Sequence, residues 1–279
     1  MRPVKGFVLA LGLFVVGVAH ADDPAARRVL TIDEQRDWSG VGRLNHSSGG
    51  FCSGALIAPD TVLTAAHCVV DQATDLPVPP RDLRFVAGLR AGVYTAHRRG
   101  AAAKIHPDWA GYRNGGEVIV EGDLAIVKLE SPISGVEARQ FDIGRAPGNN
   151  SNVTLVSYGR GRERALSIQD PCQIVQRFDR SGALNCDSVN GTSGAPVFHD
   201  GRIVGVISAS DLIEGGRSYA VWVEGAIDVL TGGASPTVAP PPQLTSQDPT
   251  APAPGVGGLF KSAPTGGSRL PGGKRAPVQ

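Results

Sequence analysis

The sequence predicts an all-β protein made of two packed barrels or sandwiches, and three observations lead to this fold class. The apolar runs between Trp38 and Leu230 are short and rich in valine and isoleucine, which is typical of β-strands. Glycine, proline, asparagine or aspartate separates these runs, and few windows hold a helical period. Residues 22–234, which remain when both ends are set aside, are numerous enough for two β-domains.

The expected elements follow in chain order. Continuous apolar runs predict strands at residues 51–57, 83–87, 124–129, 153–158 and 203–208. Residues 196–204 read as a hairpin, because Asp200 and Gly201 favour a tight turn between two apolar stretches. The one helix candidate is residues 224–230, which two glycines follow. A change of composition at residues 146–151 predicts a linker between the two β-domains.

The N-terminal end is expected to be removed. Arg2 and Lys5 precede an apolar run that closes on Ala19-His20-Ala21, so residues 1–21 have the pattern of a signal peptide with its cleavage site. An uncleaved membrane anchor is the disfavoured alternative, because the run is short for a bilayer span and small residues stand where cleavage needs them. We expect export, an N-terminus at Asp22, no stable membrane insertion, and a secreted or periplasmic location.

The C-terminal end is expected to be a disordered tail. Residues 235–279 hold 10 prolines and 7 glycines and show neither strand nor helix periodicity. Such a segment buries too little apolar surface to offset the entropy of ordering it. Its excess of basic residues would allow weak contact with an acidic surface, but a solvated linker without a partner is the simpler interpretation.

Composition excludes several classes of function. The net charge is +1 and the isoelectric point about 7.7, so the chain lacks the whole-chain basic field that drives nucleic-acid binding. Four cysteines are too few for a small disulfide scaffold in a chain of this length. An ordinary hydrophobic core must therefore supply the stability.

Three short motifs carry candidate chemistry. His67 follows a predicted strand, Asp123 begins one, and Ser193 lies in a glycine-rich stretch between two. A serine hydroxyl is a poor nucleophile at neutral pH and needs a base such as His67, which in turn needs a carboxylate such as Asp123 to orient its ring. Gly191 can adopt a turn that aims its N–H, with that of Ser193, at a developing oxyanion. Each motif alone is weak, and a plain glycine-rich hairpin is the structural alternative, but the three together are specific.

In the order His, Asp, Ser, with Cys68 beside the histidine, these motifs resemble the chymotrypsin/trypsin-like serine peptidases, particularly their secreted bacterial branch related to the V8-like glutamyl endopeptidases. The resemblance runs from about Trp38 to Leu230 and is strongest at residues 52–68 and 186–197. It implies a chymotrypsin-like double barrel, two antiparallel six-stranded β-barrels with a short C-terminal helix. The expected boundaries are an N-terminal arm at 22–37, a first barrel with His67 and Asp123 at 38–146, and a second barrel with Ser193 at 147–234.

The resemblance also implies an activity, a secreted serine endopeptidase that cuts proteins or peptides through an acyl-enzyme. It implies a monomer that needs neither cofactor nor metal. A non-catalytic or regulated protease-fold binding module in the cell envelope is the alternative. Reactivity of Ser193 towards an organophosphonate would distinguish the two.

The cysteines agree with the resemblance. Four cysteines allow three pairings, but Cys52 with Cys68 and Cys172 with Cys186 close short local loops, and the first matches the bridge that the family places beside its catalytic histidine. Metal binding by Cys68 near His67 is the alternative. The chain has neither a CxxC motif nor a histidine pair at ligand spacing, which disfavours it.

Two departures from the family affect activation and specificity. Thr192 stands where animal trypsin-like enzymes carry an aspartate that pairs with a freshly cut N-terminus, so we expect trimming between Asp22 and Trp38 to be secondary. Asp187 stands where trypsin-like members read arginine or lysine, in a pocket that we expect Ser208 and Ser210 to line.

The pocket has other interpretations. Residues 186–188 are also similar to the Cys-Asp-Thr element of relatives that cut after acidic residues. Ile207, however, stands where those relatives have a histidine that reads glutamate. The predicted preference is therefore Arg or Lys, with a small or apolar residue next and glutamate last.

Overall fold

The structure is a computed structural model, and it describes residues 26–111, 120–211, 216–233 and 261–262. The predicted signal peptide and all of the predicted tail except Lys261 and Ser262 lie outside these residues. In the described part, no helix is long and apolar enough to cross a membrane.

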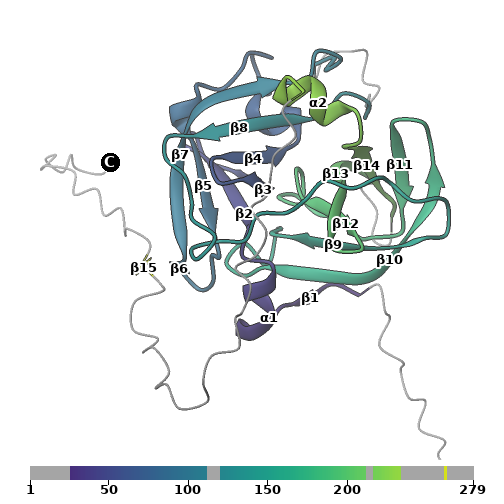
Figure 1. Cartoon of the computed structure of the whole chain (residues 1–279), viewed down its shortest axis with the longest axis horizontal. Helices are drawn as coiled ribbons and strands as arrows, with labels where there is room; N and C mark the ends of the chain where they lie inside the picture. Colours follow the sequence, from purple (N-terminus) through teal and green to yellow (C-terminus); the bar gives the residue numbers. More distant parts are fainter. Residues whose placement is uncertain (1–25, 112–119, 212–215, 234–260, 263–279) are drawn as a thin grey trace, which may run out of the picture.

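Six strands close the first barrel, as the resemblance predicts (Figure 1). In the order of their pairing they are β2 (Val41–His46), β3 (Phe51–Ala58), β4 (Thr61–Thr64), β8 (Ala125–Leu129), β7 (Ala96–Ile105) and β5 (Leu83–Ala87). Strand β5 shows why these residues form a barrel wall. Leu83, Phe85 and Ala87 are buried while Arg84 faces solvent, which is the alternation of a strand with one apolar face.

Six further strands form the second barrel, which closes because β9 pairs with both β12 and β10. In the order of their pairing they are β10 (Ser167–Arg177), β11 (Ser181–Leu184), β14 (Ser218–Trp222), β13 (Arg202–Ser210), β12 (Pro196–His199) and β9 (Asn152–Ser157). The predicted hairpin is confirmed, since His199 pairs with Arg202 and both turn residues have positive φ, 49° at Asp200 and 72° at Gly201. All strands predicted from apolar runs are present within a residue or two of their expected bounds.

The connection between the barrels runs from the end of β8 to the start of β9, and it contains the predicted linker. The domain boundaries at 146 and 147 stay predictions. Trp38 and Phe141, which flank the first barrel's strands, pack against Phe198 of β12 with ring centroids 4.8 and 4.9 Å away. One apolar cluster therefore joins the two barrels.

The N-terminal arm contains structure that the sequence analysis did not predict. Strand β1 (Arg28–Val29) pairs with β10 of the second barrel, and helix α1 (Ile32–Asp37) follows it. Thr31 caps this helix by accepting from the Glu34 amide, while the Glu34 carboxylate accepts from the Thr31 amide. The Thr-x-x-Glu spacing is visible in the sequence, so this helix start was predictable.

The remaining elements are short. The predicted C-terminal helix is confirmed as α2 (Ala226–Thr231), and Gly232 ends it in the left-handed conformation. Two 3₁₀ turns, η1 (Ala66–Val69) and η2 (Pro80–Asp82), interrupt the first barrel's loops. Strand β6 (Val93–Tyr94) pairs with β15 (Lys261–Ser262).

Candidate active site

Strand pairing in the first barrel brings His67 to Asp123. Thr64, the last residue of β4, pairs with Ala125, the first residue of β8. Because the two strands are antiparallel, the chain that leaves β4 and the chain that enters β8 lie at the same end of the barrel. His67, in η1 just after β4, therefore meets Asp123, just before β8.

Three donors converge on the buried Asp123 carboxylate. His67 Nδ1 lies 2.7 Å from Oδ2, and the His67 amide donates to Oδ1 at 2.9 Å. The Ser208 hydroxyl of β13 also donates to Oδ2. The Asp123 side chain is 2% exposed and the His67 side chain 18%. An ionised carboxylate can only accept, so the ring donates from Nδ1 and its Nε2 becomes the proton acceptor.

Ser193 belongs to the second barrel, but its backbone is hydrogen-bonded to the first barrel. The amide of Ser53, in β3, donates to the Ser193 carbonyl at 2.8 Å. A Cβ added to the neighbouring Gly194 would lie 2.2 Å from Thr64 Oγ1 and 2.3 Å from the Ser53 carbonyl oxygen. The segment of Ser193 and Gly194 therefore packs against Thr64, the last residue of β4, after which the chain continues to His67.

Gly191 has the conformation that the predicted turn needs. Its φ is +94°, and a Cβ there would lie 2.3 Å from the Phe51 ring, so only glycine fits without strain. Its carbonyl accepts the Ser53 hydroxyl at 2.9 Å. In the described part of the chain, the amides of Gly191 and Ser193 donate to no protein acceptor. Two donors next to the Ser193 hydroxyl are therefore uncommitted.

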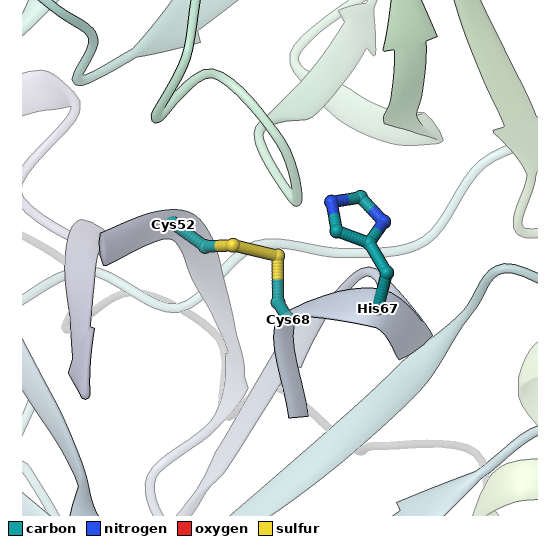
Figure 2. Close-up of side chains that lie close together, drawn as sticks. All are labelled: Cys52, His67 and Cys68. Atoms are coloured by element: carbon teal, nitrogen blue, oxygen red, sulfur yellow. A yellow bond between two sulfur atoms is a disulfide. The ribbon is translucent and has the colours of Figure 1, made fainter. Parts of the chain in front are cut away.

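Both predicted disulfides are present. Cys52 pairs with Cys68 and Cys172 with Cys186. Figure 2 shows the first bridge beside the His67 ring. The ligand atoms of Cys52, His67 and Cys68 lie within 4.8 Å of one another, as in a metal site. The two sulfurs are bonded to each other at 2.00 Å, however, and a disulfide offers no thiolate to a metal.

The residues predicted to form the specificity pocket lie in different surroundings. The Asp187 side chain is 47% exposed, and its Oδ2 lies 3.5 Å from Arg27 Nη2 of the N-terminal arm. The Ser208 hydroxyl donates to Asp123, so its proton is not available to a group in the predicted pocket. Ser210 is half-buried at the end of β13, and residues 212–215 just beyond it lie outside the described residues.

Two contributors to the site were missed by the sequence analysis. Ser53 joins the barrels, since its hydroxyl donates to Gly191 and accepts from the Tyr158 amide. Arg27 reaches the loop that precedes Ser193. Both act across long sequence separations, so no local pattern signals them.

The comparisons with known proteins point to one family. The family model described as Trypsin matches residues 31–226. A trypsin of Saccharopolyspora erythraea is 26% identical over 57% of this chain and 74% of its own length. Brachyurin of Leptuca pugilator is also 26% identical, over 57% of this chain and 75% of its own length.

Solved structures are similar in fold. A Glu endopeptidase aligns with a TM-score of 0.62 and 18% identity, covering 74% of this chain and 95% of that one. A scabies mite inactivated protease paralogue aligns with a TM-score of 0.59 and 16% identity, covering 73% of this chain and 97% of that one. At these identities the likeness concerns the fold alone. Because a protease described as inactivated shares it, activity must be argued from the site.

Proposed function

The chain belongs to the trypsin family, and from this premise we propose that it is a serine endopeptidase that hydrolyses peptide bonds through an acyl-enzyme on Ser193. One observation carries the proposal. The Asp123 carboxylate accepts hydrogen bonds from both the ring Nδ1 and the backbone amide of His67, an arrangement that orients the ring to act as a base. The Ser193 carbonyl accepts a hydrogen bond from the Ser53 amide of strand β3, in the same barrel as His67. A binding module would have no need for an imidazole oriented in this way.

The chemistry follows from the roles of these groups. His67 Nε2 removes the proton of the Ser193 hydroxyl as its oxygen attacks the peptide carbonyl. The amides of Gly191 and Ser193 donate to the oxyanion that forms, and each such donor lowers the barrier by about 3 kcal/mol. Asp123 stabilises the imidazolium, which then gives its proton to the leaving amine. Water, deprotonated by His67, releases the acyl group and restores the serine.

We place the site of action outside the cytoplasm. Two disulfides join all four cysteines, and such bridges persist in oxidising compartments. The signal-peptide pattern of residues 1–21 agrees with export.

For specificity we propose a preference for Arg or Lys that depends on Asp187 and is modest. A half-exposed carboxylate can accept a guanidinium or ammonium group from substrate. The Arg27 guanidinium already lies 3.5 Å from this carboxylate. Its positive charge would repel the positive charge of an Arg or Lys side chain of the substrate. We therefore expect a smaller preference than an unpaired carboxylate would give.

A mixed peptide library read by mass spectrometry tests the activity. We expect cleavage by the chain from Asp22 onward, loss of cleavage in Ser193→Ala, and retention in Ser151→Ala, which changes a partly exposed serine of the same barrel outside the predicted pocket. Cleavage that persists in Ser193→Ala, or none by the unaltered chain, would contradict the proposal.

The same library tests specificity. Asp187→Ser should remove the excess of Arg and Lys at the cleaved bond while cleavage elsewhere continues. An unchanged residue preference would show that Asp187 does not read the substrate, and cleavage after small or apolar residues by the unaltered chain would replace the proposed preference.

A further inference from the structure

We propose that Arg27 is a positioning residue, whose guanidinium holds the segment at residues 187–193 in the conformation that the reaction needs. The N-terminal arm would then be part of the working enzyme from Arg27 onward. This inference rests on the proposed function and adds to it a residue that precedes the region matched by the family.

The burial of Arg27 is the first observation. Its side chain is 7% exposed, and its Nε has no hydrogen-bond partner in the described part of the chain. Burial lowers the pKa of this guanidinium, and the carboxylate paired with it, Asp187, is half-exposed. Removing a cation from water costs free energy that such a pair repays poorly. A surface position would be cheaper for a residue that only completed an ion pair.

The buried Arg27 guanidinium contacts the segment that leads to Ser193. Arg27 Nη2 donates to the carbonyl of Asp187, which the Gln169 side chain also holds through its amide donor. A Cβ added to Gly159 would lie 3.3 Å from Arg27 Nη1, 2.8 Å from Val189 and 3.2 Å from Thr192 Oγ1. The guanidinium, Val189 and Thr192 therefore meet around one glycine.

Val189 and Thr192 form the turn that carries the nucleophile. The Thr192 amide donates to the Val189 carbonyl at 2.9 Å, and the Val189 amide donates to Thr192 Oγ1 at 3.2 Å. Ser193 and its amide follow directly. A guanidinium packed beside this turn restrains both the hydroxyl and the two uncommitted amides.

The arm is anchored without this side chain. Arg28 and Val29 pair with Ile168 and Ser167, and the Leu30 amide donates to the Leu166 carbonyl at 3.0 Å. Leu30 itself is 1% exposed. Loss of the Arg27 guanidinium should therefore leave the arm docked, so its effect on the reaction can be separated from unfolding.

Trimming of the N-terminal arm should have different effects before and after Arg27. Removal of residues 22–26 leaves the Arg27 contacts intact and should be neutral. Removal of Arg27 as well should impair the enzyme although β1 and α1 remain. The sequence predicts that all trimming between Asp22 and Trp38 is secondary. Under this inference that would be true only of trimming that stops before Arg27.

The test compares Arg27→Met with Arg28→Met in the full chain. Arg28 is a matched control, because it neighbours Arg27 but is 56% exposed and pairs with Glu34 at the surface. On a substrate with a small apolar residue at the cleaved bond, which does not engage the Asp187 carboxylate, we expect kcat of Arg27→Met to fall about 10²-fold with KM little changed, at a melting temperature close to that of Arg28→Met. Added guanidinium ion should restore part of the rate, and Arg28→Met should stay within about twofold of the unaltered chain.

Hydrogen exchange of the amides at residues 187–193 provides a readout that does not require catalysis. Faster exchange there in Arg27→Met than in Arg28→Met supports the inference even if the unaltered chain cleaves nothing, an outcome that would contradict the proposed function alone. Equal exchange and equal kcat in the two variants would overturn the inference. If Arg27→Met fails to fold, the same comparison with Arg27→Lys decides, because the lysine keeps the charge but not the geometry of the guanidinium.

Discussion

His67 and Asp123 stand at the ends of two paired strands of the first barrel, whereas Ser193 lies on a segment of the second barrel between strands β11 and β12. In the first barrel, the β4–β8 ladder itself brings His67 to Asp123. In the second, contacts from Ser53 of the other barrel and from Arg27 of the arm position the segment.

This difference indicates which part of the site should tolerate single substitutions. A strand ladder distributes its restraint over many hydrogen bonds, so the His67–Asp123 contact should survive most single changes nearby. The Ser193 segment depends on a few long-range contacts, so single changes that disturb these contacts should reduce activity strongly.

The largest effect is expected for Asp123→Asn. An amide cannot stabilise the imidazolium and favours the wrong ring tautomer, so kcat/KM should fall by about 10⁴-fold. Asp60→Asn, which changes another carboxylate of the same barrel, should have little effect on activity. Steady-state kinetics of both variants check this, and a loss below about tenfold for Asp123→Asn would contradict the role of the carboxylate.

Gly194→Ala should come next, with loss of both activity and stability. Its φ is +77°, and the added methyl would meet Thr64 and Ser53 at 2.2–2.3 Å, so the two barrels must separate locally. We expect a destabilisation of about 3 kcal/mol. Gly201→Ala is the control, since φ is +72° with open space around it, and the strain alone should cost about 1 kcal/mol. Denaturant unfolding that gave equal values would show that the contact between the barrels is not tight.

Ser208→Ala should have a smaller effect. It removes one of the donors to the Asp123 carboxylate, a charge-assisted bond, while the His67 contacts remain. We expect kcat/KM to fall about tenfold. Ser210→Ala, two residues along the same strand, leaves Asp123 untouched and should change KM rather than kcat if Ser210 lines the pocket. A Ser208 variant that changes KM alone, as expected for the Ser210 variant, would show that the hydrogen bond to Asp123 does not contribute to catalysis.

The smallest effect concerns pH. Burial lowers the pKa of His46 and of His106, both in the first barrel, below their ordinary value of 6.5. The unfolded chain then binds more protons, so stability is full above about pH 6.5 and is lost as the pH falls through the folded-state values. Replacing both with glutamine should flatten the dependence of the unfolding free energy on pH below 6.5. An unchanged slope would assign the acid sensitivity to other groups.

The strands and the candidate site could be predicted from the sequence, because local residue patterns indicate them. Apolar runs marked the strands, and the motifs around His67, Asp123 and Ser193 marked the candidate site. Helix α1 was missed although its Thr31 and Glu34 cap is a local signal. Arg27 and Ser208 could not be assigned in this way, since their partners lie 160 and 85 residues away in the chain.

Labelling by an organophosphonate, read as the intact mass and mapped by peptide digestion, tests the central claim most directly. The account predicts one label per chain, on Ser193, at a rate that collapses in His67→Ala and vanishes in Ser193→Ala. An unlabelled chain, or a label that His67→Ala does not slow, would contradict the claim that the two barrels together assemble a serine nucleophile with its base.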